Sequence, residues 1–369
     1  MEFAVIASAL ICRIEKPLMR SLALMILLSC SGQLLSKSLD SLLQKVDGSL
    51  YFDTYYSFDF NDPNLNERPA FIYNYDQHNQ VAINMALARM SYSEKRFGIN
   101  IGLMTGTYAA ANLSHEPQNL QHLYEANMVL NFNKRKTRQL TIGVFESHLG
   151  FESAISINNP TLTRSLSAEN SPYYLSGLRY TSHIGKKLTI NLLAVNGWQR
   201  IKRENFNSIP ALGTQFTYQP NKKTLFNWST YFGSEGPDSI SDFRLFNNLY
   251  TQLGLGDKVN ITIGFDLGLQ RSGWGNGQIR AWYCPTAIFE FLLPDHQALT
   301  LRLEHYQNRV DFDLSTTGMS LGYKRIFYEK LVWKSEMRFM NDYSYPFEKD
   351  GLEWHNNAAL TTSLVILID

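Results

Sequence analysis

Hydrophobic and polar residues alternate along this chain in segments of about ten residues. In 259–269, every odd-numbered position is Val, Ile, Phe or Leu, and the positions between them are Asn, Thr, Gly or Asp. A β-strand points alternate side chains to opposite faces, so one face of this segment suits lipid and the other suits water. The same pattern recurs in 97–103, 299–304 and 331–339. The alternation therefore predicts transmembrane β-strands.

A soluble antiparallel barrel is the alternative, because its strands also alternate. The polar faces, however, often carry charge, as at Arg302, Glu304 and Glu336, whereas the apolar faces carry almost none. A water-filled lumen fits this distribution better than a packed core.

About sixteen such segments follow Asp47, and their connections alternate between short and long. The strict alternation places all the long connections on one rim and all the short turns on the other. We predict an all-β fold: a single transmembrane antiparallel up-and-down barrel of about sixteen strands, with short periplasmic turns, long extracellular loops and both termini at the periplasmic rim. The long connections are 63–79, 107–121, 148–172, 199–209, 234–241, 270–278, 308–313 and 341–355.

The N-terminus has the layout of a secretory signal peptide. Lys16 and Arg20 precede the apolar run 22–28, and small residues follow it. We assign residues 1–36 to this signal, with Met19 as a candidate true start, and residues 37–369 to the barrel domain. Leu27-Leu28-Ser29-Cys30 also resembles a lipoprotein cleavage box, so lipidation of Cys30 stays open. A signal followed by a β-barrel predicts the bacterial outer membrane as the location.

Composition and charge exclude several other classes of protein. No composition break or linker divides the 369 residues, which favours one large domain. The chain has 34 basic and 33 acidic residues, so its balance gives no electrostatic case for nucleic acid as a partner. Cys284 is the single cysteine after the leader, which excludes an internal disulfide there.

A closed barrel of sixteen strands is too wide for its inward side chains to fill, so an aqueous channel is expected. The connection 148–172 is the candidate for narrowing it, because it is the longest and carries Glu152, Arg164 and Glu169. An ordinary surface loop is the alternative for this segment.

Parity with the lipid-facing positions assigns charged side chains to the lumen. If strand four faces strand twelve, Glu125 and the acids of the 148–172 loop lie opposite Arg280 and Arg302, and such opposed charges would favour polar permeants. Lateral ion pairs between neighbouring wall residues are the alternative. The predicted pore-lining residues are Asp53, Glu125, Arg179, Arg244, Asp266, Arg280, Glu290, Arg302, Glu304, Lys334, Glu336 and Arg338, with Asp59 and Lys324 also inward by parity.

Catalytic and cofactor chemistry finds little support in the sequence. His148, Glu152 and Ser153 share one loop, but such residues occur in polar loops by chance, and a catalytic triad depends on geometry. The chain has no Gly-x-Ser-x-Gly or His-Glu-x-x-His motif, and its eight histidines show no metal-ligand spacing. We expect neither enzyme activity, nor a cofactor, nor a metal.

Several motifs, most of them in the first half of the chain, resemble the OmpL-like β-barrel porins of Bacteroidetes. They are Asp53-Thr54-Tyr55-Tyr56, Tyr124-Glu125-Ala126, His148-Leu149-Gly150-Phe151-Glu152-Ser153-Ala154, Asn159-Pro160-Thr161-Leu162-Thr163-Arg164-Ser165, Ala168-Glu169-Asn170-Ser171-Pro172-Tyr173-Tyr174 and Asn196-Gly197-Trp198-Gln199-Arg200-Ile201. One departure is the C-terminus, where Asp369 stands in place of the aromatic residue that ends many outer-membrane barrels.

The resemblance implies an outer-membrane porin and brings no catalytic residues with it. The function expected is an aqueous channel for passive diffusion of small polar solutes. A substrate-specific transporter, for example for a saccharide, and a non-conducting structural or adhesive barrel are the alternatives. The partners expected are outer-membrane lipid and small polar solutes or ions, and a homo-oligomer stays open.

Overall fold

The structure is a computed structural model that describes residues 45–240, 242–271, 277–310 and 313–369. The expected signal peptide, its Met19 start and the lipidation site at Cys30 lie outside the described residues. Among the residues described, no helix is both long and apolar enough to cross a bilayer.

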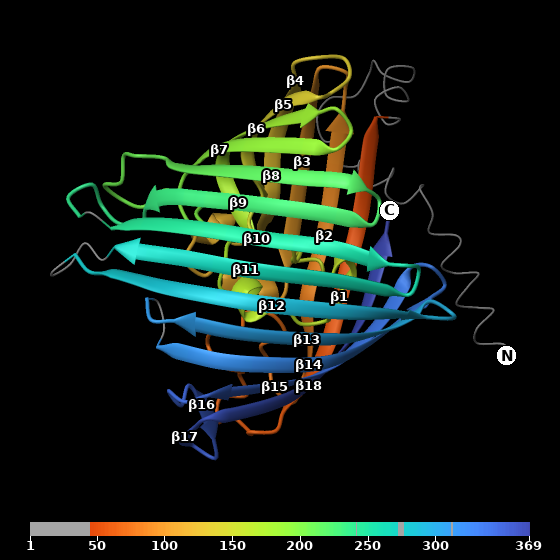
Figure 1. The fold of residues 1–369 in the computed structure, drawn as a ribbon, viewed down its shortest axis with the longest axis vertical. Coiled ribbons are helices and arrows are strands. Elements are labelled where there is room, and N and C mark those ends of the chain that lie inside the picture. The colour runs from red at the N-terminus through yellow and green to blue at the C-terminus, as the bar shows by residue number, and fades with distance from the viewer. Residues whose placement is uncertain (1–44, 241, 272–276, 311–312) are drawn as a thin grey trace, which may run out of the picture.

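Sixteen antiparallel strands close into one barrel, in which each strand pairs with its neighbours in sequence and β1 pairs with β18 (Figure 1). This confirms the predicted fold class and the strand number. The barrel strands are β1 (Val46–Asp59), β2 (Val81–Ser93), β3 (Phe97–Thr105), β4 (Leu123–Asn131), β5 (Arg138–Glu146), β6 (Tyr174–Ile184), β7 (Leu188–Val195), β8 (Ala211–Asn221), β9 (Thr224–Ser234), β10 (Phe243–Leu255), β11 (Val259–Arg271), β12 (Ile279–Leu293), β13 (Gln297–Asn308), β14 (Leu314–Phe327), β15 (Leu331–Asp342) and β18 (Asn356–Ile368).

Short elements occupy the long connections. Helix α4 (Thr107–Asn112) and the 3₁₀ turn η1 (Gln118–Leu120) lie between β3 and β4, while η2 (Ser156–Asn158) and α5 (Leu166–Glu169) lie between β5 and β6. The connection after β15 was predicted as a loop, but it contains a two-stranded hairpin of β16 (Phe347–Lys349) and β17 (Leu352–Trp354).

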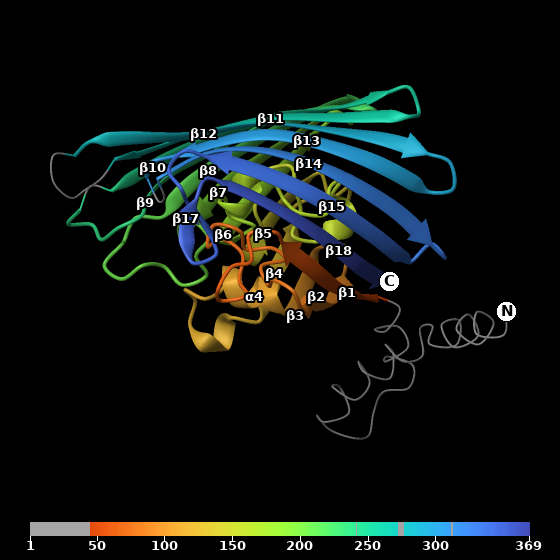
Figure 2. The ribbon, with the colours of Figure 1, turned by 90° about the horizontal axis from the view of Figure 1, so that it is seen from below.

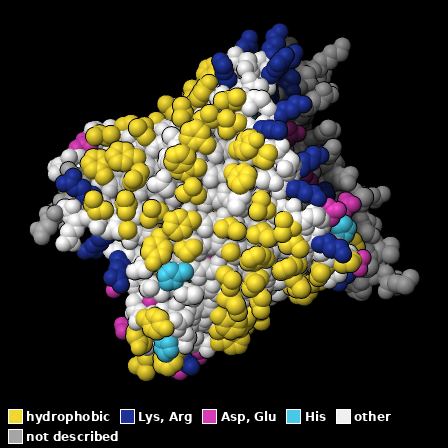
Figure 3. Space-filling model, in the orientation of Figure 1, with side chains coloured by type: hydrophobic (Ala, Val, Ile, Leu, Met, Phe, Trp, Pro, Cys, Tyr) yellow, Lys and Arg dark blue, Asp and Glu magenta, His cyan; other side chains and the backbone are white. Residues whose placement is uncertain are grey.

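Alternation in the sequence becomes an outside and an inside in the barrel. On β11, Ile263 is 50% exposed and Phe265 is 42% exposed. Asp266, the next residue along the strand, points inward and is only 4% exposed. In the view of Figure 3, apolar side chains are spread over the outer wall, and the charged side chains lie mainly at its edges. Apolar burial in lipid therefore replaces the protein core that a soluble sheet would need on this face.

The connections on the two rims differ in length, as predicted. The turns between β6 and β7 and between β10 and β11 need only three residues, and Gly185 and Gly256 each take a φ of +63° there. A positive φ of this kind is what a tight hairpin requires, and Gly adopts it without steric cost. The pairing of Leu50 with Ile368 places the start of β1 and the end of β18 at this short-turn rim.

One long connection, 147–173, runs inside the barrel. Its yellow-green ribbon lies within the ring of strands in both views (Figures 1 and 2). Leu149 and Leu166 are buried in a cluster with inward residues of the wall, including Phe246 on β10 and Trp282 on β12. The barrel thus holds a segment of its own chain in its lumen.

The outward position of Ile263 can be tested with Ile263→Arg. An arginine on the lipid face near the middle of a strand costs about 2 to 4 kcal/mol of stability, so the denaturant midpoint in lipid or detergent should fall. Asn260→Arg is the matched control on the same strand, since Asn260 is exposed toward the lumen and donates to the Glu290 carboxylate at 2.9 Å. Equal midpoints for the two variants would contradict the assignment of faces.

Candidate channel constriction

Residues 147–173 cross the lumen and bond to residues of β1, β8 to β11, β13 and β15. Near its start, the His148 Nε2 lies 2.8 Å from the Thr230 carbonyl oxygen on β9, and the Gly150 N–H donates to Asn248 on β10 at 3.1 Å. Further along, the Ser167 hydroxyl donates to the Asp266 carboxylate on β11. The segment is therefore anchored on the wall far from the two strands that it connects.

Two wall carboxylates hold the middle of this segment by its backbone. Glu336 on β15 accepts from the N–H groups of Leu162 and Thr163 at 2.8 and 2.9 Å, and from the Thr163 hydroxyl at 2.8 Å. Glu304 on β13 accepts from the N–H of Leu166 at 2.6 Å. Leu166 begins helix α5, so this carboxylate satisfies a free N–H at the first turn of the helix.

Lys334 on β15 provides the opposite kind of anchor. Its ammonium group donates to the carbonyl oxygens of Ser156 and Asn159 at 2.6 Å each, and to that of Thr161 at 3.0 Å. The residue is 1% exposed. A lysine ammonium has three donors, and three carbonyls of the loop are placed to accept them.

Arg302 on β13 joins the wall and the loop into one charged network. Its guanidinium lies 3.0 Å from Glu336, 3.2 Å from Glu304 and 4.0 Å from Glu152 of the loop, and donates to the Thr163 carbonyl at 2.6 Å. The side chain is 0% exposed. A charge buried to this extent requires partners, because removing one partner from such a group costs several kcal/mol.

Local sequence explains how the loop presents these groups. Ser165 caps α5 by accepting from the Ala168 N–H at 3.2 Å, and serine is among the residues preferred at this position. Glu152 accepts from the Ser165 N–H at 3.1 Å to each carboxylate oxygen. The two arms of the loop are thus tied together around the start of α5.

Arg164 and Glu169 tie the loop to two other long connections. Their side chains are 3.6 Å apart, and both are buried. The Arg164 guanidinium lies over the ring of Tyr108 in α4, 5.2 Å from its centroid. Glu169 accepts from the Tyr73 N–H at 2.9 Å. The structure therefore places Glu152, Arg164 and Glu169 inside the barrel, and their effect on permeation stays a prediction.

The wall charges predicted to line the pore face inward but differ in their surroundings. Arg338 donates to Glu304 at 2.7 Å and belongs with Arg302 to the buried network. Asp53 accepts from Tyr75 at 2.8 Å and from Ser156 of the loop at 3.1 Å. Arg280 is exposed near the long-loop rim, and its guanidinium is 3.4 Å from the Arg309 carbonyl.

Other predicted wall residues have neighbours on their own side of the barrel. Glu125 is paired with Arg89 of β2 at 2.7 Å, and Glu290 with Lys324 of β14 at 2.6 Å, as the alternative of lateral ion pairs expected. The Arg179 guanidinium lies 4.6 Å from the centroid of the Phe145 ring, and that of Arg244 lies 4.8 Å from the Trp198 ring.

Arg89 was missed by the parity argument for a physical reason. A register irregularity follows Asp53 where β1 pairs with β2, so two consecutive residues, Asn84 and Met85, are both buried. Such a bulge reverses the parity of every position after it in β2. Alternation alone does not reveal a bulge.

The three residues considered as a catalytic set each bond elsewhere. His148 contacts the Thr230 carbonyl, Glu152 accepts from Ser165, and the Ser153 hydroxyl accepts from the Ile155 N–H at 3.1 Å. Within the described ranges, no group of His, Cys, Asp and Glu has the arrangement needed to hold a metal ion.

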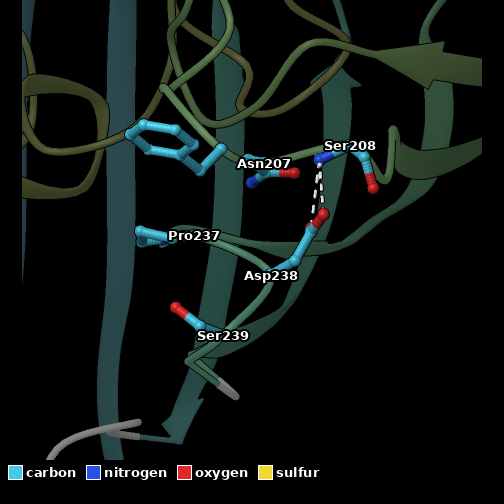
Figure 4. Close-up of a pocket in the computed structure, with 6 residues that line it drawn as sticks. Asn207, Ser208, Pro237, Asp238 and Ser239 are labelled. Atoms are coloured by element: carbon cyan, nitrogen blue, oxygen red, sulfur yellow. Dashed lines mark hydrogen bonds between the residues drawn. The ribbon is translucent and has the colours of Figure 1, made fainter.

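A separate surface hollow lies between the β7–β8 and β9–β10 connections (Figure 4). Phe206, Asn207 and Ser208 line it from one connection, and Pro237, Asp238 and Ser239 from the other. The Ser208 N–H donates to both Asp238 oxygens, at 3.0 and 3.2 Å. Hydrogen bonding by the Ser208 side chain, together with that N–H, holds the pKa of the exposed Asp238 carboxyl below its usual value. The contact joins two loops at the rim.

Comparison with known proteins identifies the family. The family model described as "Putative beta-barrel porin-2, OmpL-like" matches residues 45–368. The chain belongs to this porin family. The match covers every strand of the barrel, so this porin is placed in the bacterial outer membrane, with its short turns on the periplasmic side. No curated protein matches the sequence.

Solved structures share the fold at low sequence identity. An anion-selective porin from Comamonas acidovorans is similar with a TM-score of 0.59 at 8% identity, covering 88% of this chain and 99% of that one. The trimer form of OmpT from Vibrio cholerae has a TM-score of 0.59 at 9% identity, with 88% and 99% covered. The outer membrane channel DcaP of Acinetobacter baumannii has a TM-score of 0.59 at 8% identity, with 88% and 97% covered.

Lys334→Met should loosen the loop without breaking the wall. Hydrogen bonds to a charged group contribute about 1.5 to 3 kcal/mol each, so opening of the loop should become at least about tenfold more frequent. Hydrogen exchange read by mass spectrometry should show faster exchange in 156–165.

Lys324→Met is the matched control, because Lys324 lies directly opposite Lys334 in the β14–β15 pair but bonds to Glu290 instead of the loop. Equal exchange of 156–165 in the two variants would show that Lys334 does not hold the loop.

Proposed function

We propose that this porin is an aqueous channel for passive diffusion of small polar solutes, narrowed by the 147–173 loop. The observation that carries the proposal is the path of this loop across the lumen, with anchors on inward residues of β1, β9, β10, β11, β13 and β15. A loop held at so many points narrows the passage at a fixed level.

The chemistry of the wall supports polar permeants. Inward side chains near the periplasmic rim remain partly exposed and offer both donors and acceptors, which can replace the hydration of a passing solute. They include Arg89, Asn100, Gln139, Thr181, Gln215, Thr217, Asn260 and Lys324.

Transport without catalysis is the corresponding proposal for the loop residues. Each polar group of His148, Glu152 and Ser153 described above takes part in positioning the loop. All three residues therefore help to hold the loop in the position where it narrows the lumen.

A non-conducting barrel is the second candidate, and one observation favours it. Arg302, Lys334 and Arg338 are each at most 1% exposed, so water does not reach them at the level of the loop. If the packing is continuous around them, the barrel would stay closed until the loop moves.

Replacing 156–167 with a short Gly-Ser linker tests both candidates. The change removes the segment that contacts Lys334 and Glu336 but leaves every barrel strand intact. Single-channel conductance in planar bilayers should rise, and liposome swelling should admit larger sugars. A heat-dependent gel shift would show that the barrel has folded.

The same linker in place of 237–240 is the control, since these residues lie at the outer rim beside the surface hollow. Unchanged conductance and sugar size limit in a folded 156–167 variant would refute the constriction. Conductance that appears only in that variant, and not in the native protein, would favour the non-conducting barrel.

A further inference from the structure

The connections on the two rims of the barrel carry opposite net charge. The seven short turns contain eleven Lys or Arg residues and four acidic ones, Glu94, Asp257, Asp295 and Glu329. The basic residues are Lys95, Arg96, Lys134, Arg135, Lys136, Lys186, Lys187, Lys222, Lys223, Lys258 and Lys330.

The long connections show the reverse balance. Their described residues include seven Lys or Arg and fourteen Asp or Glu. The near-neutral total of the chain, +1, therefore hides a strong separation of charge between the rims. The acidic residues are Asp62, Glu67, Asp76, Glu116, Glu152, Glu169, Glu204, Glu235, Asp238, Asp242, Asp313, Glu348, Asp350 and Glu353.

Lipid-facing residues place the basic turns at the level of the lipid headgroups. Ile184, Leu255 and Leu293 are exposed outward at the last positions before three of the turns. Lys186 follows Ile184 by two residues and Lys258 follows Leu255 by three. At about 3.3 Å per residue, these cations lie within roughly 10 Å of the last lipid-facing side chain.

Aromatic residues mark the same boundary. Tyr and Trp gather at the membrane–water interfaces of outer-membrane barrels. Tyr323 and Trp333 lie on neighbouring strands with ring centroids 5.4 Å apart, a few residues from the 328–330 turn. Three further outward tyrosines lie close to short turns on other strands: Tyr92, Tyr180 and Tyr218.

Of the eleven basic side chains, nine have no hydrogen-bond or ion-pair partner among the described residues, since only Lys136 and Lys223 bond to a neighbour. Five of these nine, Lys134, Arg135, Lys186, Lys187 and Lys222, are exposed on three of the turns. Lys223, by contrast, is paired with Asp257 at 2.7 Å. Figure 3 shows Lys and Arg side chains gathered along the edges where the short turns lie. A row of unpaired cations at headgroup level suits an anionic ligand with many copies in the membrane plane.

We propose that the periplasmic rim of this porin binds anionic phospholipid headgroups of the inner leaflet. Each Lys or Arg close to an anionic membrane surface adds to the attraction. The short turns favour lipid over a more distant partner, because turns of two to six residues hold their cations beside the bilayer. The acidic rim on the other side leaves this preference confined to one leaflet.

The test uses the folded barrel in nanodiscs made from equal amounts of phosphatidylglycerol and phosphatidylcholine, with retained lipids counted by native mass spectrometry. The native protein should retain phosphatidylglycerol several-fold above its share. Substitution of Lys134, Arg135, Lys186, Lys187 and Lys222 by Gln should bring retention close to the bulk ratio. In the native protein, raising the salt from about 0.1 to about 1 M should also reduce the enrichment, because screening shortens from about 10 to about 3 Å.

The matched control replaces Arg200, Lys202, Arg203, Arg309 and Lys349 by Gln, which removes five positive charges from the other rim. This variant should keep the enrichment. Equal loss in both variants, or no enrichment in the native protein, would overturn the proposal. Binding to purified cell-wall sacculi that the turn variant loses, with its lipid retention unchanged, would assign the rim to that polymer and equally overturn it.

Discussion

Closure of the backbone hydrogen bonds is the constraint on which this structure depends. In lipid an unpaired strand edge has no water to bond with, so a sheet that crosses the membrane has to close on itself. Here β1 and β18 complete the ring, with residues from Leu50 to Asp59 paired to the last strand. With sixteen strands in the ring, the interior is wider than inward side chains alone can fill. Part of this extra width is occupied by the 147–173 loop, which bonds to the inward side chains of the wall.

Charged side chains that point into the barrel are compensated in two ways. Near the periplasmic rim, wall residues neutralise one another, as Glu290 does with Lys324. At the level of the loop, the wall charges are buried, and backbone groups of 147–173 supply the missing donors and acceptors. Arg302 and Lys334 can be buried because carbonyl oxygens of the loop accept hydrogen bonds from them. The same bonds hold the loop on its path across the lumen.

Sequence reasoning reached the fold because the alternation is a local property. Each strand reports its two faces within ten residues, and the tight turns carry their own Gly, Asn and Asp signals. The same parity predicted that Arg302, Glu304 and Glu336 point inward. It could not predict that these side chains are buried, because their burial depends on contacts between distant parts of the chain, such as that of Leu162 with Glu336, 174 positions apart. The bulge beside Asp53 could not be predicted either, because it is a property of the pairing between β1 and β2 and leaves no signal in the sequence of either strand alone.

The anchors of the loop have a consequence for how this porin can change. Within the part of the chain that the structure describes, the Lys334 ammonium bonds to carbonyl oxygens of Ser156, Asn159 and Thr161, and Glu336 accepts from the N–H groups of Leu162 and Thr163 and from the Thr163 hydroxyl. Most of these bonds go to backbone groups, but the side chains of the same residues are buried against the wall, where Ser156 donates to Asp53 and the Thr163 hydroxyl donates to Glu336. Substitutions at these positions would disturb the packing, whereas an exposed position such as Asn158 can change the surface met by a solute while the course of the loop is kept. The barrel thus separates the part that fixes the geometry from the part that is free to diversify.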